Sequence, residues 1–397
     1  MRGKLAKWTL LVMTVPLLGG CWDRIEIDQR GFVVGVAVDL PEEVKETQGS
    51  KKSDRRLQGT FQFVIPAGMK SGDSSSQNGG GKAYFNMNSV ESSLPSISGN
   101  LAQKTSRTPY FEHLKIIVVS SKVAAKEGAF PEVLDYFLRD NEMRRNVKIL
   151  IADGRASDML KVKVYNEKYP VAYLESTVKN SIKSNYMLPE SRIGDVHEYF
   201  MRKESYPIQL VKTSELGIVL SGAAIIEGTG NRLVGFMSGK ETQGLNFIRN
   251  WVEGGSIEVE YDRQMVVFEV ERTRRKMSAQ MEAEGRVAFK IAIQAEGTLG
   301  KSTGMLDVND ENVVRKLESR LEKEIVNIVN QSVQVAQHKF KLDPLGLGAY
   351  LYQNRYPLWK RVMRDWERGS CLFCKAKVDV DAEVTIRRIG NINKNER

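Results

Sequence analysis

LKIIVVS (residues 114–120) decides the fold of the first half of the chain, together with the two segments that follow it, VAAKEGAFPEVLDYFLRD (123–140) and VKILIA (147–152). The two apolar runs predict buried strands, and the segment between them predicts a helix that is broken or restarted at Pro131. A strand–helix–strand order with continuous apolar strands is typical of an α/β layer with some parallel pairing.

The residues upstream of this unit predict a hairpin and a loop. GFVVGVAVDL (31–40) indicates a buried strand, and LQGTFQFVI (57–65) alternates like a second strand that pairs with it. The Gly/Ser-rich run PAGMKSGDSSSQNGGGK (66–82) predicts a flexible loop. A polar helix is expected over 89–104, and residues 155–205 predict a small helical subdomain or connector.

The second half of the chain shows a different pattern. Alternating runs separated by turn signals predict mainly antiparallel strands at 217–226, 232–237, 256–261, 265–271 and 286–297. A long helix over 310–341 carries an apolar stripe that should pack on this sheet. A shorter helix (356–368) and a last strand (377–388) follow it.

These patterns predict an α+β, multi-domain fold. Residues 1–20 are set aside as a signal peptide, as argued below. Residues 21–205 form a mixed α/β N-terminal region, and residues 206–397 form a C-terminal domain in which a mainly antiparallel sheet packs against the long helix.

Composition excludes several classes of protein. Apolar residues make up 41% of the chain and charged residues 27%, an ordinary globular balance that argues against wholesale disorder. No run of 18 apolar residues predicts a membrane-spanning helix. The net charge of +10 favours contact with an anionic surface. Aromatic and basic residues do not alternate in a nucleic-acid-binding pattern.

The N-terminus has the pattern of a secretory signal peptide. Three basic residues precede an apolar run from Trp8 to Leu18, and small residues then lead to a cysteine, Gly19-Gly20-Cys21. This junction resembles a bacterial lipobox, which implies cleavage before Cys21 and a thioether-linked diacylglycerol on its sulfur. Two buried acyl chains anchor a protein stably to a membrane. We expect no other cofactor.

No motif in the sequence indicates catalysis. The nucleophile elbow, the phosphate-binding loop and the HExxH zinc motif are missing, and three histidines with three cysteines leave little material for a metal cage. Cys371 and Cys374 follow a predicted helix and precede a strand, the reverse of the order in redox CxxC motifs. We interpret them as a structural or fortuitous pair that oxidation outside the cytoplasm could join.

The stretch GCWDRIEI (20–27) resembles the start of the C-subunit lipoproteins of bacterial spore nutrient germination receptors, the Ger(x)C family. Further landmarks occur in the family's order: RTPYFEHLKIIVVS (107–120), LDYFLRDNEMRRN (134–146), the stretch 222–237 with Thr229-Gly230 interrupting it, KLDPLGLGAYLYQNRYPLWKRVMRDW (341–366) and RRIG (387–390). The Cys371–Cys374 segment departs from the family pattern.

The resemblance implies a non-enzymatic subunit on the outer face of the spore inner membrane. Its implied partners are a polytopic A-type subunit, a transporter-like B-type subunit and membrane lipid, in a complex that responds to nutrients. The alternative is a solute-binding lipoprotein of an importer, a class that needs two similar α/β lobes. The mainly antiparallel second half argues against that class.

Two sets of residues are candidate partner contacts. Trp22, Asp23, Arg24 and Glu26 directly follow the lipidated cysteine, and an aromatic with alternating charges suits docking at an interface better than a free tether. Trp359 and Trp366 are seven residues apart and are therefore expected on one face of the helix at 356–368. We assign Trp366 to the core and Trp359 to a partner contact.

Overall fold

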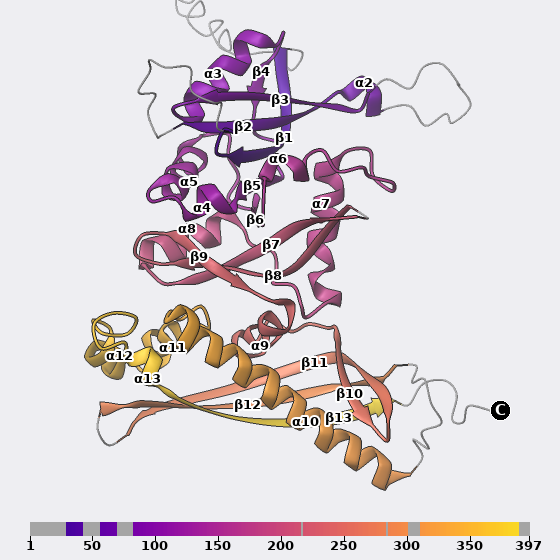
Figure 1. Ribbon diagram of the computed structural model, residues 1–397, viewed down its shortest axis with the longest axis vertical. Coiled ribbons are helices and arrows are strands. Elements are labelled where there is room, and N and C mark those ends of the chain that lie inside the picture. The colour runs from indigo at the N-terminus through magenta and orange to yellow at the C-terminus, as the bar shows by residue number, and fades with distance from the viewer. Residues whose placement is uncertain are drawn as a thin grey trace, which may run out of the picture.

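The computed structural model describes residues 29–42, 56–69, 82–215, 217–282, 285–300 and 310–388. Within these residues, a nine-stranded sheet and a four-stranded sheet lie one beyond the other along the longest axis of the molecule (Figure 1). The first sheet uses strands between Arg30 and Met237, and the second uses strands between Ser256 and Arg388. The expected α+β, multi-domain fold is confirmed.

The larger sheet is mixed. Its order is β3-β2-β1-β5-β6-β7-β8-β9, with β4 paired to the start of β1. The central strands β1, β5, β6 and β7 run parallel, while β2, β3, β8 and β9 add antiparallel edges. Their bounds are β1 Arg30–Asp39, β2 Leu57–Val64, β3 Tyr84–Glu91, β4 Thr108–Tyr110, β5 Ile116–Ser120, β6 Lys148–Ala152, β7 Tyr206–Ser214, β8 Gly217–Glu227 and β9 Arg232–Met237.

Helices cover both faces of this sheet, which is why its central strands are apolar throughout. One face carries α3 (Leu94–Lys104), α4 (Ser121–Ala125), α5 (Ala129–Arg139) and α8 (Ile193–Arg202). The other carries α6 (Ala156–Met159) and α7 (Pro170–Val178), which continues into the 3-10 helix η3 (Lys179–Lys183). The four-residue α2 (Pro66–Met69) follows β2.

The segment 155–205 is therefore not a separate helical subdomain. Leu174 of α7 packs on one face of the sheet and Ile193 of α8 packs on the other, so the segment's helices are divided between two cores. The strands β7 to β9 also extend the same sheet past residue 206, where we expected the domain boundary. Turn signals mark where strands end but not which strands pair.

Some of the helices and strands predicted for residues 31–140 are confirmed, and others begin at different residues. The predicted hairpin exists, since β1 and β2 pair antiparallel. The polar helix begins only at Leu94, capped by Ser93, because residues 84–91 form β3, whose mixed polarity hid it. The break between α4 and α5 falls at Gly128, with φ of 73°, and Pro131 lies in the first turn of α5. Beyond Met69, the predicted loop lies outside the described residues.

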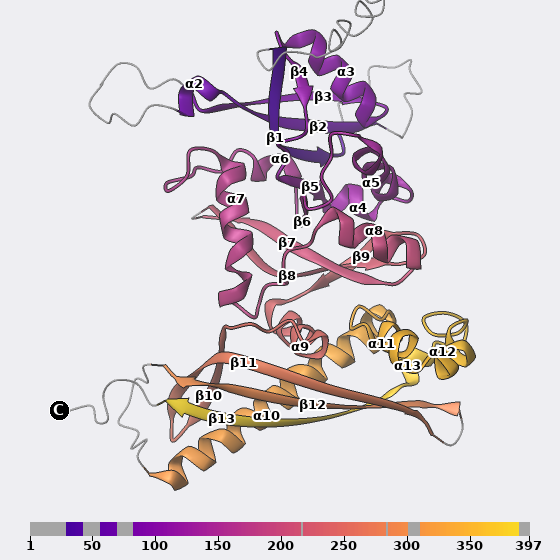
Figure 2. The same cartoon turned by 180° about the vertical axis from the view of Figure 1, so that it is seen from behind.

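The smaller sheet has the order β10-β11-β12-β13, and β13 pairs parallel to β12 while the other pairs are antiparallel. The long helix α10 (Glu311–Gln334) continues as the π-helical segment η5 (Val335–Phe340) and crosses one face of the sheet (Figure 2). The predicted stripe of Leu317, Leu321 and Ile325 is fully buried there. The strands are β10 Ser256–Tyr261, β11 Gln264–Met281, β12 Val287–Leu299 and β13 Lys377–Arg388.

Two glutamates of α10 reach the outer edge of this sheet. The Glu322 carboxylate accepts the amide N–H of Val384 over 3.2 Å, and the Glu318 carboxylate accepts that of Ile386 over 3.0 Å. Buried or edge amides without partners are costly. The helix therefore pairs amides that β13 would otherwise present to solvent.

Helix α9 (Gly239–Arg249) connects the two sheets. It begins with a capping box in which Ser238 and Glu241 pair reciprocally, and most of its side chains are buried. Gly244 lets it approach α10, because a Cβ there would overlap the Ser332 hydroxyl and the Ile328 carbonyl oxygen. Asn246 donates to the Asn185 and Met187 carbonyls and so joins α9 to the larger sheet and its helices, between Arg30 and Met237, which are called the upper body below.

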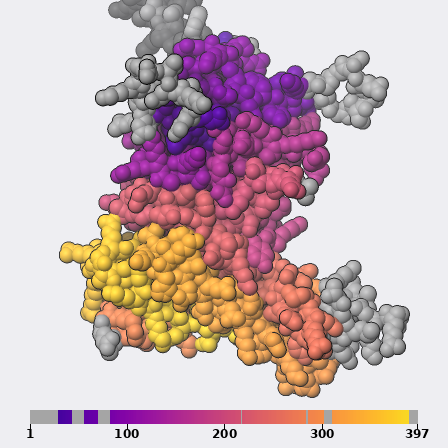
Figure 3. All heavy atoms as spheres, viewed as in Figure 1, coloured from indigo at the N-terminus to yellow at the C-terminus, as the bar shows by residue number. Residues whose placement is uncertain are grey.

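Three short helices complete the C-terminal body: α11 (Leu347–Asn354), α12 (Tyr356–Val362) and α13 (Leu372–Lys375). They lie at one end of α10, directly beneath the larger sheet (Figure 3). The helix predicted over 356–368 ends at Val362, because the amides of Leu372 and Phe373 donate back to the carbonyls of Asp365 and Trp366 and fold the chain into a loop.

Candidate functional site

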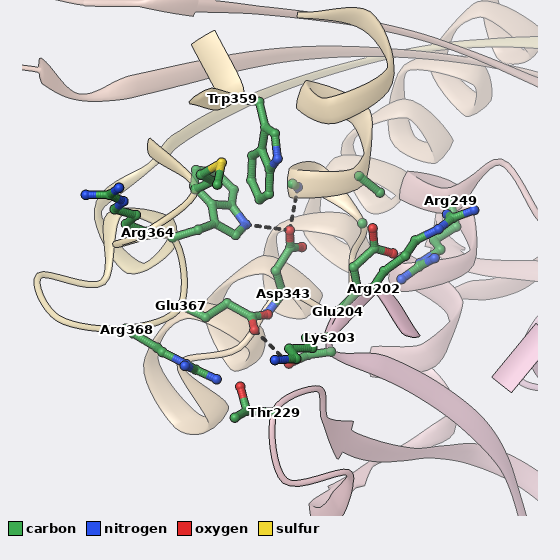
Figure 4. Close-up of a pocket in the computed structure, with 16 residues that line it drawn as sticks. Arg202, Lys203, Glu204, Thr229, Arg249, Asp343, Trp359, Arg364, Glu367 and Arg368 are labelled. Carbon is green, nitrogen blue, oxygen red and sulfur yellow. Dashed lines mark hydrogen bonds between the residues drawn. The ribbon is translucent and has the colours of Figure 1, made fainter. Parts of the chain in front are cut away.

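A cavity of about 490 Å³ lies where the C-terminal helices meet the larger sheet (Figure 4). The upper body contributes the end of α8, the residues between α8 and β7, and the β8–β9 turn. Helix α9 contributes Arg249, and the C-terminal body contributes residues between Asp343 and Arg368. The charged and aromatic lining residues are Arg202, Lys203, Glu204, Arg249, Asp343, Trp359, Arg364, Trp366, Glu367 and Arg368.

Asp343 organises the floor of the cavity. Its carboxylate accepts the amides of Leu347 and Gly348 at the start of α11, over 3.1 and 2.6 Å, and the indole N–H of Trp366 over 2.9 Å. One buried side chain thus fixes both the start of the next helix and Trp366. A buried carboxylate needs such donors.

Glu367 connects this floor to the upper body. One oxygen of its carboxylate accepts the Asp343 amide over 2.6 Å, and the other accepts the Ser205 hydroxyl over 2.8 Å. Ser205 in turn accepts the Gly228 amide over 3.1 Å. Glu367 therefore joins three segments of the chain at the junction of the two bodies.

Glycines in the closing segment leave space for large neighbours. A Cβ at Gly348 would lie 2.7 Å from Trp366 Nε1 and 3.1 Å from Trp359 Cζ3. Gly346 has φ of 77°, a left-handed conformation that favours glycine, and lies against the Arg249 guanidinium. Gly346 and Gly348 thus permit close packing around the two tryptophans.

Arg249 and Glu204 form the side of the cavity near α8. Arg249 donates to the Pro344 carbonyl over 2.8 Å, and its guanidinium lies 4.8 Å from the Trp251 ring centre. Glu204 is half-buried, and the charges of Arg202, Arg249 and Asp343 act on its carboxylate. Within the described residues, no hydrogen bond to the Glu204 side chain was found.

Burial raises the pKa of all three acids in the cavity. For Glu367, desolvation and the neighbouring Asp343 charge raise the pKa to about 7. Desolvation also raises the pKa of Asp343, against the opposing effect of its three donors, and that of Glu204, against the opposing charges of Arg202 and Arg249. The floor therefore carries less negative charge at neutral pH than three ordinary carboxylates would.

The structure places the predicted contact residues in different surroundings or leaves them outside the described residues. Trp366 is 4% exposed, which confirms its assignment to the core, and Trp359 is half-buried at the cavity wall with its ring centre 6.0 Å from that of Trp366. The two do not share a helix face, because Trp366 lies beyond the end of α12. Cys21 and the predicted contacts Trp22, Asp23, Arg24 and Glu26 lie outside the described residues.

Cys371 and Cys374 are joined by a disulfide. The bridge flanks Phe373, which is fully buried against Trp366, and Gln337 donates to the carbonyls of Phe373 and Ala376. The structural interpretation of the pair therefore agrees with its surroundings. No group of metal-ligating side chains was found among the described residues, and none of their helices is long and apolar enough to span a membrane.

Sequence reasoning missed Ser205, Glu204, Arg249 and Glu367 as site residues. They lie in unrelated segments, and tertiary packing alone brings them together. One signal was available for Glu367, since it directly follows Trp366 in the segment that closes over Asp343. Nothing local distinguishes Ser205.

Comparison with known protein families covers nearly the whole chain. Residues 23–212 match the family described as "Spore germination protein N-terminal domain", and residues 221–390 match "Spore germination B3/ GerAC like, C-terminal". The chain belongs to the GerAC-like family of spore germination proteins. The GerAC-like C-terminal match includes Asp343, Trp359, Trp366 and Glu367, while the N-terminal match includes Glu204 and Ser205, so the cavity lies where the two halves meet.

Three GerAC-like relatives from Bacillus subtilis (strain 168) align along almost their full length. Spore germination protein YndF is 29% identical, with 99% of each chain covered. Spore germination protein B3 is 25% identical over 98% of this chain and 99% of its own, and spore germination protein A3 is 24% identical over 96% of each. The crystal structure of the GerBC protein matches with a TM-score of 0.60 and 25% identity, covering 92% of this chain and all of that one.

Proposed function

We propose that this protein is the lipid-anchored C-subunit of a spore nutrient germination receptor. The observation that carries the proposal is the pair of family matches, which follow one another from residue 23 to residue 390 and begin two residues after the lipobox cysteine. The relatives are named as spore germination proteins, and they align with this chain along almost their whole length. Diacylglycerol on Cys21 would hold the chain on the outer face of the spore inner membrane.

The subunit acts without catalysis, as a scaffold or signalling module beside a polytopic A-type subunit and a transporter-like B-type subunit. The cavity supports this role, because Glu367 joins the two bodies through Ser205 and the Asp343 amide, and the Asp343 carboxylate holds the start of α11 and Trp366 in place. The importer alternative is not favoured, since the two sheets differ in strand number and order.

A surface on α11 and α12 is the best candidate for contact with a partner subunit. Tyr352, Tyr356 and Met363 are each about half exposed, and Trp359 is half-buried beside them. Exposed cations surround them: Arg355, Lys360, Arg361 and Arg364. Aromatic, methionine and arginine side chains are enriched at protein interfaces. Trp359 retains its assignment as the contact anchor.

The anchor is tested by Cys21→Ala in the native spore. We expect loss of fatty-acid label from the protein, release from the membrane fraction and a weaker germination response, with Cys374→Ala as the control that keeps the label. Label retained on Cys21→Ala would contradict the anchor. Co-purification of the A-type and B-type subunits with the wild-type chain tests the assembly separately.

The contact surface is tested by Tyr356→Ala, with Tyr165→Ala as the control because Tyr165 is exposed on the other body. Neither change removes a core side chain, so both proteins should melt like the wild type. We expect only Tyr356→Ala to reduce co-purification with the partner subunits. Equal recovery of the partners with both variants would exclude this surface.

A further inference from the structure

We propose that the cavity between the two bodies binds a small organic anion. Its charged oxygens would lie between Lys203 and Arg368, and its apolar part would lie against Trp359. This inference concerns the cavity itself and does not depend on the receptor role. No known activity of the family enters it.

The first support is a pair of cations without acidic partners. Lys203 and Arg368 both line the cavity, and neither forms an ion pair within the part of the chain that the structure describes. Figure 4 draws both side chains in the lower part of the cavity, near Thr229. Both side chains are exposed to solvent, and an anion between two like charges that line one cavity would offset their repulsion.

The two cations are held in place by the backbone. Lys203 ends α8 in a left-handed conformation with φ of 54°, and its amide donates to the carbonyls of Tyr199 and Phe200. Arg368 directly follows Glu367, whose carboxylate is fixed by Ser205 and the Asp343 amide. Both attachment points are therefore fixed before any ligand arrives, which lowers the entropic cost of binding.

The second support is the aromatic wall. Trp359 is half-buried, and its ring lies edge-on to Trp366 at an interplanar angle of 71°. Gly348 leaves room for both rings, because a Cβ there would lie 2.7 Å from Trp366 Nε1 and 3.1 Å from Trp359 Cζ3. An apolar face beside cationic groups is the arrangement that recognises a molecule with a charged head and a flat apolar part.

The third support is the size of the space. About 490 Å³ falls within the range of roughly 300–1,000 Å³ that is usual for small-molecule pockets. This volume accommodates a small aryl or alkyl carboxylate or phosphate ester. We assign the ligand to water-soluble molecules of this size.

Glu204 makes it possible to test the sign of the ligand's charge. Its carboxylate lines the same cavity and would repel an anion but attract a cation. Replacement by glutamine removes the charge and keeps the shape. Glu204→Gln should therefore tighten binding of an anion, whereas it would weaken binding of an ammonium ligand.

Titration calorimetry on the full chain, purified in neutral detergent, tests the proposal with phenyl phosphate and benzoate as probes. Inorganic phosphate supplies charge alone, and benzamide supplies the apolar ring alone. We expect phenyl phosphate to bind more tightly than either fragment and to quench tryptophan fluorescence. No saturable binding of phenyl phosphate or benzoate up to about 10 mM would overturn the proposal.

Variants connect the binding to the cavity. Loss of one charge-assisted contact should weaken phenyl phosphate binding by about tenfold in Arg368→Gln and Lys203→Gln. Arg361→Gln is the matched control, because Arg361 is an exposed cation of α12 that does not line the cavity. Equal weakening in Arg361→Gln, or weaker binding in Glu204→Gln, would also overturn the proposal. Unchanged melting temperatures show that the variants are folded.

Discussion

The Ser205 hydroxyl donates to the Glu367 carboxylate over 2.8 Å, although the two residues are 162 positions apart. Ser205 immediately precedes β7 of the larger sheet, and Glu367 belongs to the loop that follows α12. Because Glu367 also accepts the Asp343 amide, this contact couples the position of the upper body to the floor of the cavity. The first two predictions concern this cluster.

Stability should fall as pH rises from about 4.5 to about 7. The pKa of Glu367 is raised from its ordinary 4.5 to about 7 in the folded protein, so the folded state binds the proton more tightly than the unfolded chain. The contribution is complete below the unfolded pKa and is lost as pH rises through 7, on the order of 3 kcal/mol. The raised pKa of Asp343 and of Glu204 acts in the same direction.

Thermal melts at several pH values between 5 and 8 measure this effect. Glu367→Gln keeps an acceptor for the Asp343 amide and a donor for Ser205 but does not titrate, so its melting temperature should depend less on pH than that of the wild type. Glu383→Gln is the control, because Glu383 is exposed on β13. Parallel pH profiles for the wild type and Glu367→Gln would refute the assignment.

Asp343→Ala should destabilise the C-terminal body strongly. The change removes the acceptor of two buried amides and of the Trp366 indole, and buried donors without partners cost about 1–3 kcal/mol each. Asp365→Ala serves as the comparison, since Asp365 is an exposed acid of the same loop. Chemical denaturation should separate the two variants by several kcal/mol, and similar midpoints would show that the three contacts contribute little.

Replacing each of two helical glycines by alanine should have different effects on the stability of the protein. Gly244 of α9 contacts α10 so closely that an added Cβ would overlap a backbone carbonyl, so Gly244→Ala should lower the melting temperature. Gly99 of α3 has nothing within 4 Å of an added Cβ, so Gly99→Ala should be neutral or should stabilise by up to about 1 kcal/mol. A stable Gly244→Ala protein would mean that α9 can move away from α10.

The Cys371–Cys374 disulfide should stabilise the loop that carries Trp366. Closing so short a loop restricts the unfolded chain by about 2 kcal/mol in the chain-entropy account. The double variant Cys371→Ser, Cys374→Ser should therefore melt a few degrees below the wild type, and a reducing agent should not change its melting temperature. The wild type in reducing agent should melt like the double variant, and a wild type unaffected by reduction would contradict this role.

The sequence predicted the long-range architecture best where a segment is uniform over many residues. The stripe from Leu317 to Ile328 fixed the face of α10 that meets the sheet, because every third or fourth residue is apolar over several turns. The uninterrupted apolar run in β5 indicated a strand covered on both faces in the same way.

Prediction failed where distant backbone contacts decide the structure. Spacing alone put Trp359 and Trp366 on one helix face, but amides from residues 372 and 373 turn the chain after Val362. The cavity could not be foreseen either. Its acids and cations are ordinary surface residue types in sequence, and only tertiary packing brings them together at the junction and buries its acids in whole or in part.

The two glutamates of α10 that accept amides of β13 limit how copies of this protein can meet. An incoming strand at Val384 and Ile386 would first have to displace the carboxylates of Glu322 and Glu318. Along this stretch, sheet-to-sheet polymerisation is thus opposed by the protein's own helix. A protein stored for long periods at high local concentration would gain protection from aggregation by this arrangement, at the cost of two side chains.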